Sequence, residues 1–328
     1  MNGKNLSRDE SRIVMNEIME GRATDAQISA YLVALRMKGE TTDEIAGSAE
    51  ALKKNTSQIT LNQEKIVDIS GTGGDNLNTF NISTSAAITA AGAGIKVAKH
   101  GKRSITTKCG SADILKLLGV KIDLGETAIN KCLAEIGLAF IFAPKFQSTW
   151  PYVVGPRREI GSRTILNLLS TMIQPVRIKR QVIGVYDQTL MAKVIDALRE
   201  LGAEHVMAVH GEDGLDEITI SGKTKVLELI ENDIYEYEIK PEDFGLSTAP
   251  LSAIQTESCE ENEKIIENVL NNIPGPALNI VLLNAAALIK VGGMVESISE
   301  GIEKAKKSIE TGAAREILNK LIKMTNSF

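Results

Sequence analysis

At 328 residues the chain is long enough to bury a full hydrophobic core, and its length favours two domains or one large domain with a subdomain. Hydrophobic residues make up 43% of the sequence and charged residues 24%, as is typical of a soluble globular protein. The formal net charge of −5 and the 4% share of aromatic residues argue against a broad nucleic-acid-binding surface, and no run of 18 apolar residues predicts a membrane span.

The cysteine pattern bears on the cellular compartment. Cys109, Cys132 and Cys259 have neither CxxC nor metal-type spacing, so we expect reduced thiols. The first residues contain no apolar segment of the signal-peptide kind. Both observations favour a cytoplasmic location.

The N-terminal segment, residues 7–56, has an all-helical pattern. Ser7 followed by Glu10 is typical of a capping box at the start of a helix. The expected helices end near Met19, Met37 and Lys54, with Thr24 or Asp25 capping the second and Thr41 or Thr42 the third. The face left over is small and apolar, which favours a subdomain or a dimer contact over an independent fold.

From about residue 65 onward, short apolar strands alternate with helices. This alternation predicts a mainly parallel central sheet flanked by helices. The expected strands are 66–69, 95–98, 138–142, 182–185, 205–210 and 217–220. The expected helices are 84–93, 111–118, 126–136, 163–173, 190–201, 276–290 and 294–325, with Gly292 and Gly293 between the last two.

We therefore expect an α/β fold in two parts. Residues 1–65 would form a small all-helical domain, joined by the helices near 163–180. Residues 66–328 would form the α/β domain, in which any site at the strand ends would lie.

A glycine-rich turn joins the first expected strand to the helix after it. The turn contains Gly71, Gly73 and Gly74, and the side chains that follow it at N-cap positions are those of Asn81, Ser83 and Thr84. Glycines let backbone N–H groups converge on an anion, and a helix N-terminus adds unpaired donors. The pattern predicts a phosphate or pyrophosphate site of neither the P-loop nor the dinucleotide type, although a ligand-free strand–turn–helix junction also uses glycines.

A basic segment follows the next expected strand and runs from Lys99 to Asp113. It contains a second glycine-to-helix junction and four cations, namely Lys99, Lys102, Arg103 and Lys108. Ligands of open α/β sheets bind at the carboxyl ends of strands, so this segment and the glycine-rich turn should face one crevice. A solvated basic loop is the alternative interpretation.

Two adjacent carboxylates, Asp216 and Glu217, follow an Asp–Gly turn. Mg²⁺ prefers hard oxygen ligands together with water and substrate, so such a pair suits a metal that bridges to phosphate oxygens. Asp–Gly turns also occur for structural reasons alone. Two phosphate-type loops and a carboxylate pair together predict a site for a Mg²⁺-bound polyphosphate sugar.

Short motifs occur in a defined order along the chain: Gly71-Thr-Gly-Gly-Asp75, Thr79-Phe-Asn-Ile-Ser-Thr84, Lys99-His-Gly, Lys108-x-Gly-Ser-Ala-Asp113, Phe142-Ala-Pro144, Arg157-Arg-Glu-x-Gly161, Gly184-Val-Tyr186 and Asp213-Gly-Leu-Asp-Glu217. Their order and spacing resemble the anthranilate phosphoribosyltransferase family, and the resemblance covers nearly the whole chain. Nucleoside phosphorylases of the pyrimidine type share the fold and a looser Lys-His-Gly loop, but not the last motif in this setting.

The resemblance implies Mg²⁺-dependent transfer of the 5-phosphoribosyl group from 5-phosphoribosyl 1-pyrophosphate (PRPP) to the amine of anthranilate, with release of pyrophosphate, in tryptophan biosynthesis. It also implies a homodimer, with no membrane or nucleic-acid partner. By position, PRPP would contact Gly71, Gly74, Asp75, Thr79, Asn81, Ile82, Ser83, Thr84, Lys99, Lys102, Arg103, Thr107 and Ser111. Metal ligands would be Ser83, Asp216 and Glu217, and the acceptor would contact Gly71, Lys102 and Arg157.

No catalytic triad is expected, because an aromatic amine needs little activation as a nucleophile. His100 is a candidate general base, but a structural or ligand-orienting role is the favoured interpretation. The work of the site would be positioning and the electrostatic stabilisation of leaving pyrophosphate.

Three departures from the family pattern fall on the acceptor side. Lys102 stands where the family has an acceptor-contacting Asn, Phe146–Trp150 replaces aromatic-His-Pro-Ala-Met, and Ser170–Gln174 replaces Gly-Pro-Leu-x-Asn. Three hypotheses stay open: anthranilate in a variant pocket, another aromatic or heterocyclic acceptor, and a non-catalytic nucleic-acid-binding paralogue. The acidic charge and the intact carboxylates argue against the third.

Overall fold

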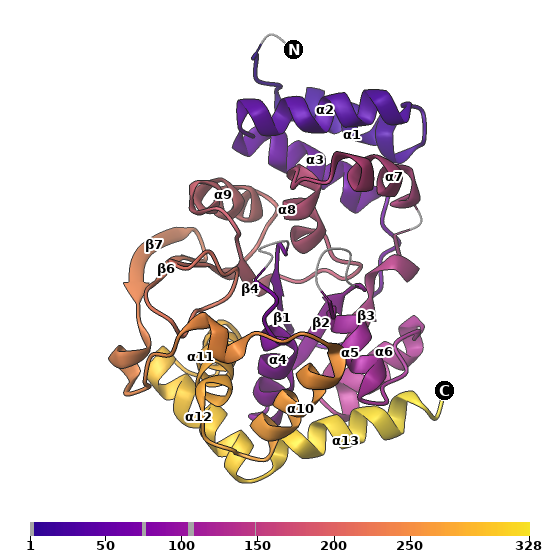
Figure 1. Ribbon diagram of the computed structural model, residues 1–328. Coiled ribbons are helices and arrows are strands. Elements are labelled where there is room, and N and C mark those ends of the chain that lie inside the picture. The colour runs from indigo at the N-terminus through magenta and orange to yellow at the C-terminus, as the bar shows by residue number, and fades with distance from the viewer. Residues whose placement is uncertain (1–2, 74–76, 104–107, 148) are drawn as a thin grey trace.

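The computed structural model describes residues 3–73, 77–103, 108–147 and 149–328, and Figure 1 shows the arrangement of its elements. The N-terminal helices are α1 (Arg8–Met19), α2 (Asp25–Lys38) and α3 (Thr42–Lys54). Each begins at a capping box whose N-cap is Ser7, Thr24 or Thr41, respectively. The helices expected in the N-terminal segment are therefore confirmed, since the side chain of each cap accepts the backbone N–H three residues on.

A mixed β-sheet lies at the centre of the described part of the molecule. Five of its strands are parallel: β1 (Val67–Gly71), β2 (Val97–Gly101), β3 (Leu138–Phe142), β4 (Arg180–Gly184) and β5 (His205–Gly211). The hairpin of β6 (Thr224–Ile230) and β7 (Asp233–Ile239) continues the sheet antiparallel to β5. The order is β3-β2-β1-β4-β5-β6-β7, so the expected α/β fold with a mainly parallel sheet is confirmed.

One strand prediction is wrong. Residues 217–220 were expected to be a strand, but they form irregular backbone that leads to the β6–β7 hairpin. Ile218 is buried, and its backbone N–H and C=O bond the side chain of Asn284 at 3.0 and 2.9 Å. Ile218 can therefore be buried without a neighbouring strand, because the Asn284 side chain makes the hydrogen bonds that a strand partner would otherwise make with its backbone.

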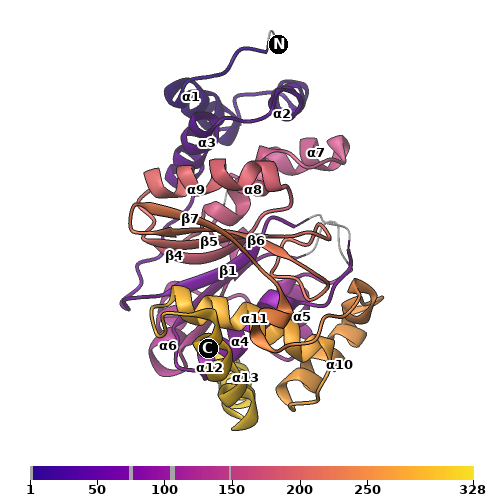
Figure 2. The same cartoon turned by 90° about the vertical axis from the view of Figure 1, so that its left-hand side faces the viewer.

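Helices cover both faces of the sheet (Figures 1 and 2). On one face α8 (Ile165–Met172) and α9 (Met191–Glu200) lie between the sheet and the N-terminal helices. On the other face α4 (Ile82–Gly92) packs against α11 (Pro276–Val291). The remaining α-helices are α5 (Ser111–Leu117), α6 (Glu126–Glu135), α7 (Pro151–Ile160), α10 (Cys259–Leu270), α12 (Ile298–Glu310) and α13 (Ala313–Thr325).

Three helix predictions need correction. The single helix expected over 294–325 is α12 followed by α13, because Gly312 adopts a φ of +75° between them. Helices α7 and α10 were not predicted at all. Helix α7 begins at Pro151 and contains a second proline, Pro156. Proline has a low helix propensity, so the sequence of this segment does not predict a helix.

Two buried clusters make up the core. The first joins α4, α11 and the C-terminal helices to one face of the sheet. The second joins α1–α3 to α8, α9 and the opposite face. The N-terminal helices thus pack as an outer layer, and a domain boundary at residues 65 and 66 stays a prediction. In the described part of the chain no helix is long and apolar enough to cross a bilayer.

Candidate active site

The loops that follow β1, β2 and β5 all leave the sheet at the carboxyl ends of its parallel strands. These strands are parallel and end at Gly71, Gly101 and Gly211. Because parallel strands have their carboxyl ends on the same side, the glycine-rich turn, the basic segment and the Asp216 segment lie near one another there. The described parts of the three segments that the sequence predicts to face one crevice therefore begin at the same ends of the strands, and the crevice itself stays a prediction.

Asp216 lies against the paired ends of β1 and β4. Gly71 and Gly184 are partners in register, and a Cβ at either position would overlap atoms of Asp216. The Gly73 N–H donates to Asp216 Oδ2 at 2.6 Å, and the Thr72 hydroxyl lies 3.5 Å from the same oxygen. The two glycines make the space that brings a carboxylate from beyond β5 into the glycine-rich turn.

Lys99 is buried in the middle of β2, with 2% of its surface exposed. Its Nζ donates to the Ile69 carbonyl at 2.8 Å and to the Ser83 hydroxyl at 3.1 Å. Burial lowers the pKa of the Lys99 ammonium, and the negative charges of Asp68 and Glu217 oppose this shift. The Lys99 ammonium therefore bonds to β1 and to the start of α4, and it interacts electrostatically with the acidic segment that carries Glu217.

Asn81, the N-cap of α4, is held from two directions. Asn262 on α10 accepts from the Asn81 backbone N–H at 3.1 Å and donates to Asn81 Oδ1 at 3.0 Å. The Asn81 side chain in turn donates to the carbonyl of Cys109 at 3.3 Å. Asn81 fixes the end of the basic segment next to the N-terminus of α4.

His100 is buried, and both ring nitrogens face oxygen acceptors. Nδ1 lies 2.7 Å from Asp68 Oδ2, and Nε2 lies 3.1 Å from the carbonyl of Ser170 on α8. Gln174 donates to the same Asp68 oxygen at 2.7 Å and to Gln181 at 3.1 Å. With both nitrogens engaged, this arrangement favours the positioning role of His100 over that of a base.

Lys102 and Arg157, the two cations expected to contact the acceptor, lie within electrostatic reach of each other. Burial lowers the pKa of Lys102 to about 8, and the charge of Arg157 adds to the shift. Burial also lowers the pKa of Arg157, whose guanidinium lies 5.4 Å from the ring centroid of Trp150. Two cations that repel each other in a partly buried place favour an anionic partner.

The other expected PRPP contacts gather at two helix N-termini. Ser111 begins α5 and packs against Gly101, where a Cβ would lie 3.2 Å from the Ser111 Cβ. Thr79, Ile82 and Thr84 lie at the start of α4, and Arg103 is exposed after β2. Three further expected contacts, Gly74, Asp75 and Thr107, lie outside the described residues.

Two hydroxyl groups in this region are buried without a partner. Thr84 Oγ1 and Ser70 Oγ make no hydrogen bond within the described structure. A buried hydroxyl normally has a partner, so these groups fit a site that receives a polar ligand.

Mg²⁺ fits the residues present. Ser83, Asp216 and Glu217 offer hard oxygen atoms, and Lys99 is adjacent to Ser83 and within electrostatic reach of Glu217. The described residues contain no group of three or more His, Cys, Asp or Glu able to hold a metal by themselves. That donor set suits Mg²⁺, which uses one or two carboxylates and takes its other ligands from water and substrate phosphates.

Two residues that shape the site were not singled out in the sequence. Asn262 holds Asn81, and Asp68 holds His100. Gly184, which makes room for Asp216, was quoted only as part of a motif. Asn262 gave no local signal, because its partner is 181 residues away in the chain. Asp68 lies three residues before the glycine-rich turn, and a carboxylate inside an apolar strand was the available signal.

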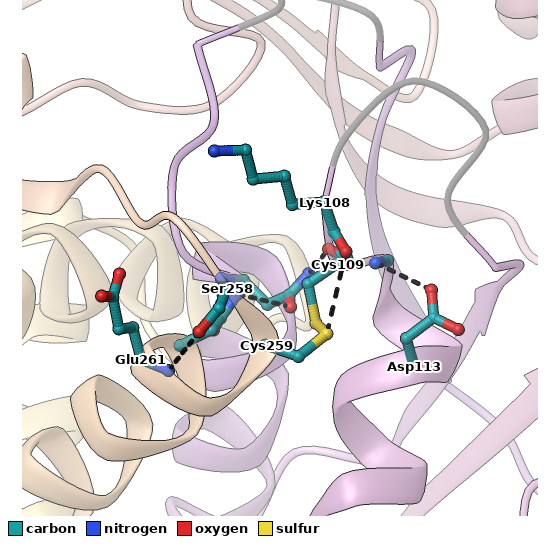
Figure 3. Close-up of a disulfide and its surroundings, with 9 residues drawn as sticks. Lys108, Cys109, Asp113, Ser258, Cys259 and Glu261 are labelled. Atoms are coloured by element: carbon teal, nitrogen blue, oxygen red, sulfur yellow. Dashed lines mark hydrogen bonds between the residues drawn. A yellow bond between two sulfur atoms is a disulfide. The ribbon is translucent and has the colours of Figure 1, made fainter.

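The expectation of reduced cysteines is wrong for two of the three. Cys109 and Cys259 form a disulfide, with their Cα atoms 5.3 Å apart, and Cys132 is free and buried. Figure 3 shows the bond joining the segment before α5 to the first residue of α10. Their separation of 150 residues conceals the pairing, since only the fold brings the two sulfurs together.

Comparison with protein families agrees with this architecture. Residues 63–315 match the "Glycosyl transferase family, a/b domain", and residues 1–56 match the "Glycosyl transferase family, helical bundle domain". An anthranilate phosphoribosyltransferase of Acetivibrio thermocellus is 44% identical over 326 residues, covering 99% of this chain and 94% of the relative. One from Petrotoga mobilis is 44% identical over 324 residues, with coverage of 99% and 94%.

Solved structures give the same result. The anthranilate phosphoribosyltransferase of Thermus thermophilus superposes with a TM-score of 0.93 at 34% identity, covering 99% of this chain and 97% of that one. The Saccharomyces cerevisiae enzyme in complex with PRPP and Mg superposes with a TM-score of 0.89 at 29% identity, covering 98% and 94%. The fold and site define a glycosyltransferase that acts on a phosphorylated sugar. More particularly, the chain belongs to the anthranilate phosphoribosyltransferase family.

Proposed function

We propose that this enzyme transfers the 5-phosphoribosyl group of PRPP to the amino group of anthranilate, releases pyrophosphate, and so acts in tryptophan biosynthesis. The observation that carries the proposal is the placement of Asp216 between Gly71 and Gly184, beside the Gly73 N–H. Glycine N–H groups and a carboxylate at one strand end suit a polyphosphate bound with its metal ion.

PRPP lies, in this proposal, across the N-termini of α4 and α5. The free N–H groups of a helix N-terminus and its positive dipole end attract phosphate oxygens. Lys99 and the polar side chains of Asn81, Ser83, Thr84 and Ser111 surround the same place. The unpartnered hydroxyl of Thr84 supports this assignment, because a phosphate oxygen would give it a partner.

The metal ligands are Ser83, Asp216 and Glu217. Mg²⁺, when bound, neutralises charge that develops on the leaving pyrophosphate. Lys99 donates to Ser83 Oγ, which engages one lone pair of this hydroxyl and leaves the second for a metal ion. The Gly73 N–H fixes one Asp216 oxygen.

The reaction is a displacement at the anomeric carbon of the ribose. Such displacements pass through an oxocarbenium-like state, with positive charge on the ring and negative charge on the leaving group. The protein stabilises that separation with cations and N–H groups that are already in place. His100, bonded to Asp68 and Ser170, acts as a positioning residue for the adjoining Lys102 segment.

The acceptor pocket is built from Lys102, Arg157 and the segments that depart from the family pattern. Arg157 binds the acceptor carboxylate, and Gly71 lies between acceptor and PRPP. The S. cerevisiae enzyme has been solved with 4-fluoroanthranilate, and its structure superposes with a TM-score of 0.88 at 29% identity. A different anionic aromatic amine is the second candidate acceptor, favoured by the extra positive charge of Lys102 beside Arg157.

We also propose a homodimer that acts in the cytoplasm. Four large hydrophobic residues on the N-terminal helices and α7 are exposed: Ile13, Met37, Tyr152 and Val154. An apolar surface of this kind favours contact with a second copy. A polyphosphate sugar carries several negative charges and does not cross a bilayer unaided, so an enzyme that uses it is expected in the compartment where the sugar is made.

The proposed function is tested by measuring pyrophosphate release with PRPP, Mg²⁺ and a panel of aromatic amines that includes anthranilate. The phosphoribosylated product is identified by its mass. We expect the highest kcat/KM with anthranilate and no release when Mg²⁺ is chelated. A higher kcat/KM with another amine would assign that acceptor instead, and no release with any amine would contradict the transfer reaction.

A further inference from the structure

We propose that Gln174 is a positioning residue for the acceptor, on which it acts through Asp68 and His100. The proposal rests on the proposed function, because it assigns to Gln174 an effect on the binding of anthranilate and not on that of PRPP. It also gives a physical role to the segment Ser170–Gln174, one of those in which the sequence departs from the family pattern.

Four buried polar side chains lie together beside α8. Gln174 Nε2 donates to Asp68 Oδ2 at 2.7 Å and to Gln181 Oε1 at 3.1 Å. Asp68 on β1 and Gln181 on β4 are partners in register, so one amide reaches both side chains. His100 completes the group, and none of the four residues has more than 5% of its surface exposed. Bulk water therefore does not replace a hydrogen bond that is lost here.

Asp68 bridges the place where β1 and β2 separate. In the described structure these strands pair at one position, Val67 with Val97, whereas β1 and β4 pair along all five residues of each strand. Beyond Val97, the His100 backbone N–H donates to Asp68 Oδ1 at 3.1 Å, and the ring Nδ1 lies 2.7 Å from Asp68 Oδ2. One carboxylate thus fixes both the backbone and the ring of His100, two residues before Lys102.

The segment Ser170–Gln174 holds His100 from two sides. At one end of the segment, the Ser170 carbonyl lies 3.1 Å from His100 Nε2. At the other end, Gln174 donates to the same Asp68 oxygen that faces Nδ1. The ring therefore cannot turn without losing an acceptor at one of its nitrogens.

The Gln174 amide fixes the orientation of the Asp68 carboxylate. Asp68 has no exposed surface and lies inside an apolar strand, so its oxygens need donors within the protein. In the described structure they accept two hydrogen bonds from His100 and one from Gln174. The charge of Asp68 also interacts with the Lys99 ammonium. Without the Gln174 donor the carboxylate can rotate, and the His100 ring loses its fixed acceptor.

The effect should fall on the acceptor and leave PRPP nearly unaffected. His100 is two residues from Lys102, a cation of the proposed acceptor pocket, so a displaced His100 displaces Lys102. On the PRPP side, Lys99 has its own hydrogen bonds to the Ile69 carbonyl and the Ser83 hydroxyl. Loss of the amide donor should raise the KM for anthranilate roughly threefold to tenfold and the KM for PRPP less than about twofold.

The first test compares Gln174→Met with Gln181→Met in steady-state kinetics with each substrate varied in turn. Methionine keeps the approximate length of glutamine and removes its amide. Gln181 is equally buried but makes no hydrogen bond to Asp68 in the described structure, so its variant should leave both KM values within about twofold of the wild type. Gln174→Asn keeps an amide that is one methylene too short for the 2.7 Å contact, and it replaces Gln174→Met if that variant does not fold.

The second test follows the His100 ring by nitrogen NMR. The chain has three histidines, and His100→Gln identifies the signals of His100 by their loss. Gln174→Met should shift the His100 ring signals, because the acceptor of Nδ1 loses its other donor. The signals of His205 and His210 should stay in place, and Gln181→Met should leave all three sets unchanged.

An unchanged KM for anthranilate in Gln174→Met and Gln174→Asn would overturn the proposal. Equal increases in both KM values would also overturn it, since a purely structural role affects the two substrates alike, and so would unchanged His100 ring signals. If the wild type releases no pyrophosphate with anthranilate, the proposed function fails, and the ring signals still decide whether Gln174 positions His100. A raised KM for anthranilate alone, together with shifted His100 signals, supports the proposal.

Discussion

Asp216 shows how single residues build this site. Its carboxylate takes the space that a side chain at Gly71 would fill, its backbone takes the space at Gly184, and its Oδ2 accepts the Gly73 N–H at 2.6 Å. An alanine at Gly71 would overlap the carboxylate, and an alanine at Gly184 would overlap the Asp216 backbone, so either substitution would displace the residue. The identity of two glycines therefore determines where a candidate metal ligand lies.

In the proposed acceptor pocket, Lys102 stands where the family is expected to have an asparagine. An amide can both donate to and accept from an aromatic amine, whereas an ammonium only donates. We predict that Lys102→Asn lowers the KM for anthranilate roughly threefold to tenfold, since one oriented hydrogen bond is worth about 1 kcal/mol. The KM for PRPP should change little. The measurement is steady-state kinetics with each substrate varied in turn.

Lys116→Asn provides the matched control, because this lysine is exposed on α5. It should leave both KM values unchanged. A Lys102→Asn enzyme with weaker PRPP binding and an unaltered KM for anthranilate would place Lys102 in the phosphate site and remove the main support for the variant pocket.

Glu228 connects four elements on the sheet's antiparallel side. The carboxylate on β6 accepts from His205 on β5, Tyr237 on β7 and Lys290 on α11, at 2.6–2.7 Å. Burial raises the pKa of Glu228, but these three hydrogen bonds outweigh burial and lower it to about 2. The hairpin is thus fastened to the parallel strands and to α11 through one ionised group.

This pKa predicts acid sensitivity. Because the folded-state pKa is below the unfolded value, the stabilisation is present above about pH 4.5 and is lost as pH falls toward 2. The free energy of unfolding of the wild type should fall by about 3 kcal/mol over this range on account of Glu228. Glu228→Gln should lack that part of the decline, as measured by chemical denaturation at a series of pH values.

The control for this prediction is Glu236→Gln, an exposed glutamate on β7. Its pH dependence of unfolding should match the wild type. If the free energy of unfolding falls equally steeply with pH in Glu228→Gln and in the wild type between pH 4.5 and about 2, Glu228 is not the source of the acid sensitivity.

At the level of elements, local rules were sufficient where the partners are close in sequence. The capping boxes at Ser7, Thr24 and Thr41 each span three residues, and those helices were predicted well. The β6–β7 hairpin was missed because the apolar run before it, 217–220, resembles a strand but bonds to Asn284 instead. The Cys109–Cys259 bond and the Asn81–Asn262 pair depend on the fold and leave no local pattern.

The whole molecule presents its N-terminal helices as an outer layer above α8 and α9 (Figure 2). Met37 on α2 is 83% exposed and Ile13 on α1 is 52% exposed. If these helices form the homodimer contact, Met37→Glu buries an unpaired charge there. We predict that this variant weakens dimerisation at least about tenfold by sedimentation.

Ile273→Glu is the control, because Ile273 is 53% exposed and lies between α10 and α11, away from the N-terminal helices. It should sediment as the wild type does. A wild-type protein that is monomeric at micromolar concentration would contradict the dimer, whatever the behaviour of the two variants.

The central claim is that the carboxylate pair at the strand ends would bind the Mg²⁺ that accompanies the pyrophosphate of PRPP. The decisive measurement is the initial rate of pyrophosphate release with PRPP, Mg²⁺ and anthranilate in Asp216→Asn combined with Glu217→Gln. We predict a loss of about a hundredfold or more, with an unchanged unfolding midpoint, because the amides keep the shape of the side chains and lose their charge. The exposed adjacent pair Glu242→Gln with Asp243→Asn should retain the wild-type rate. Unchanged turnover in the Asp216–Glu217 double variant would contradict the account.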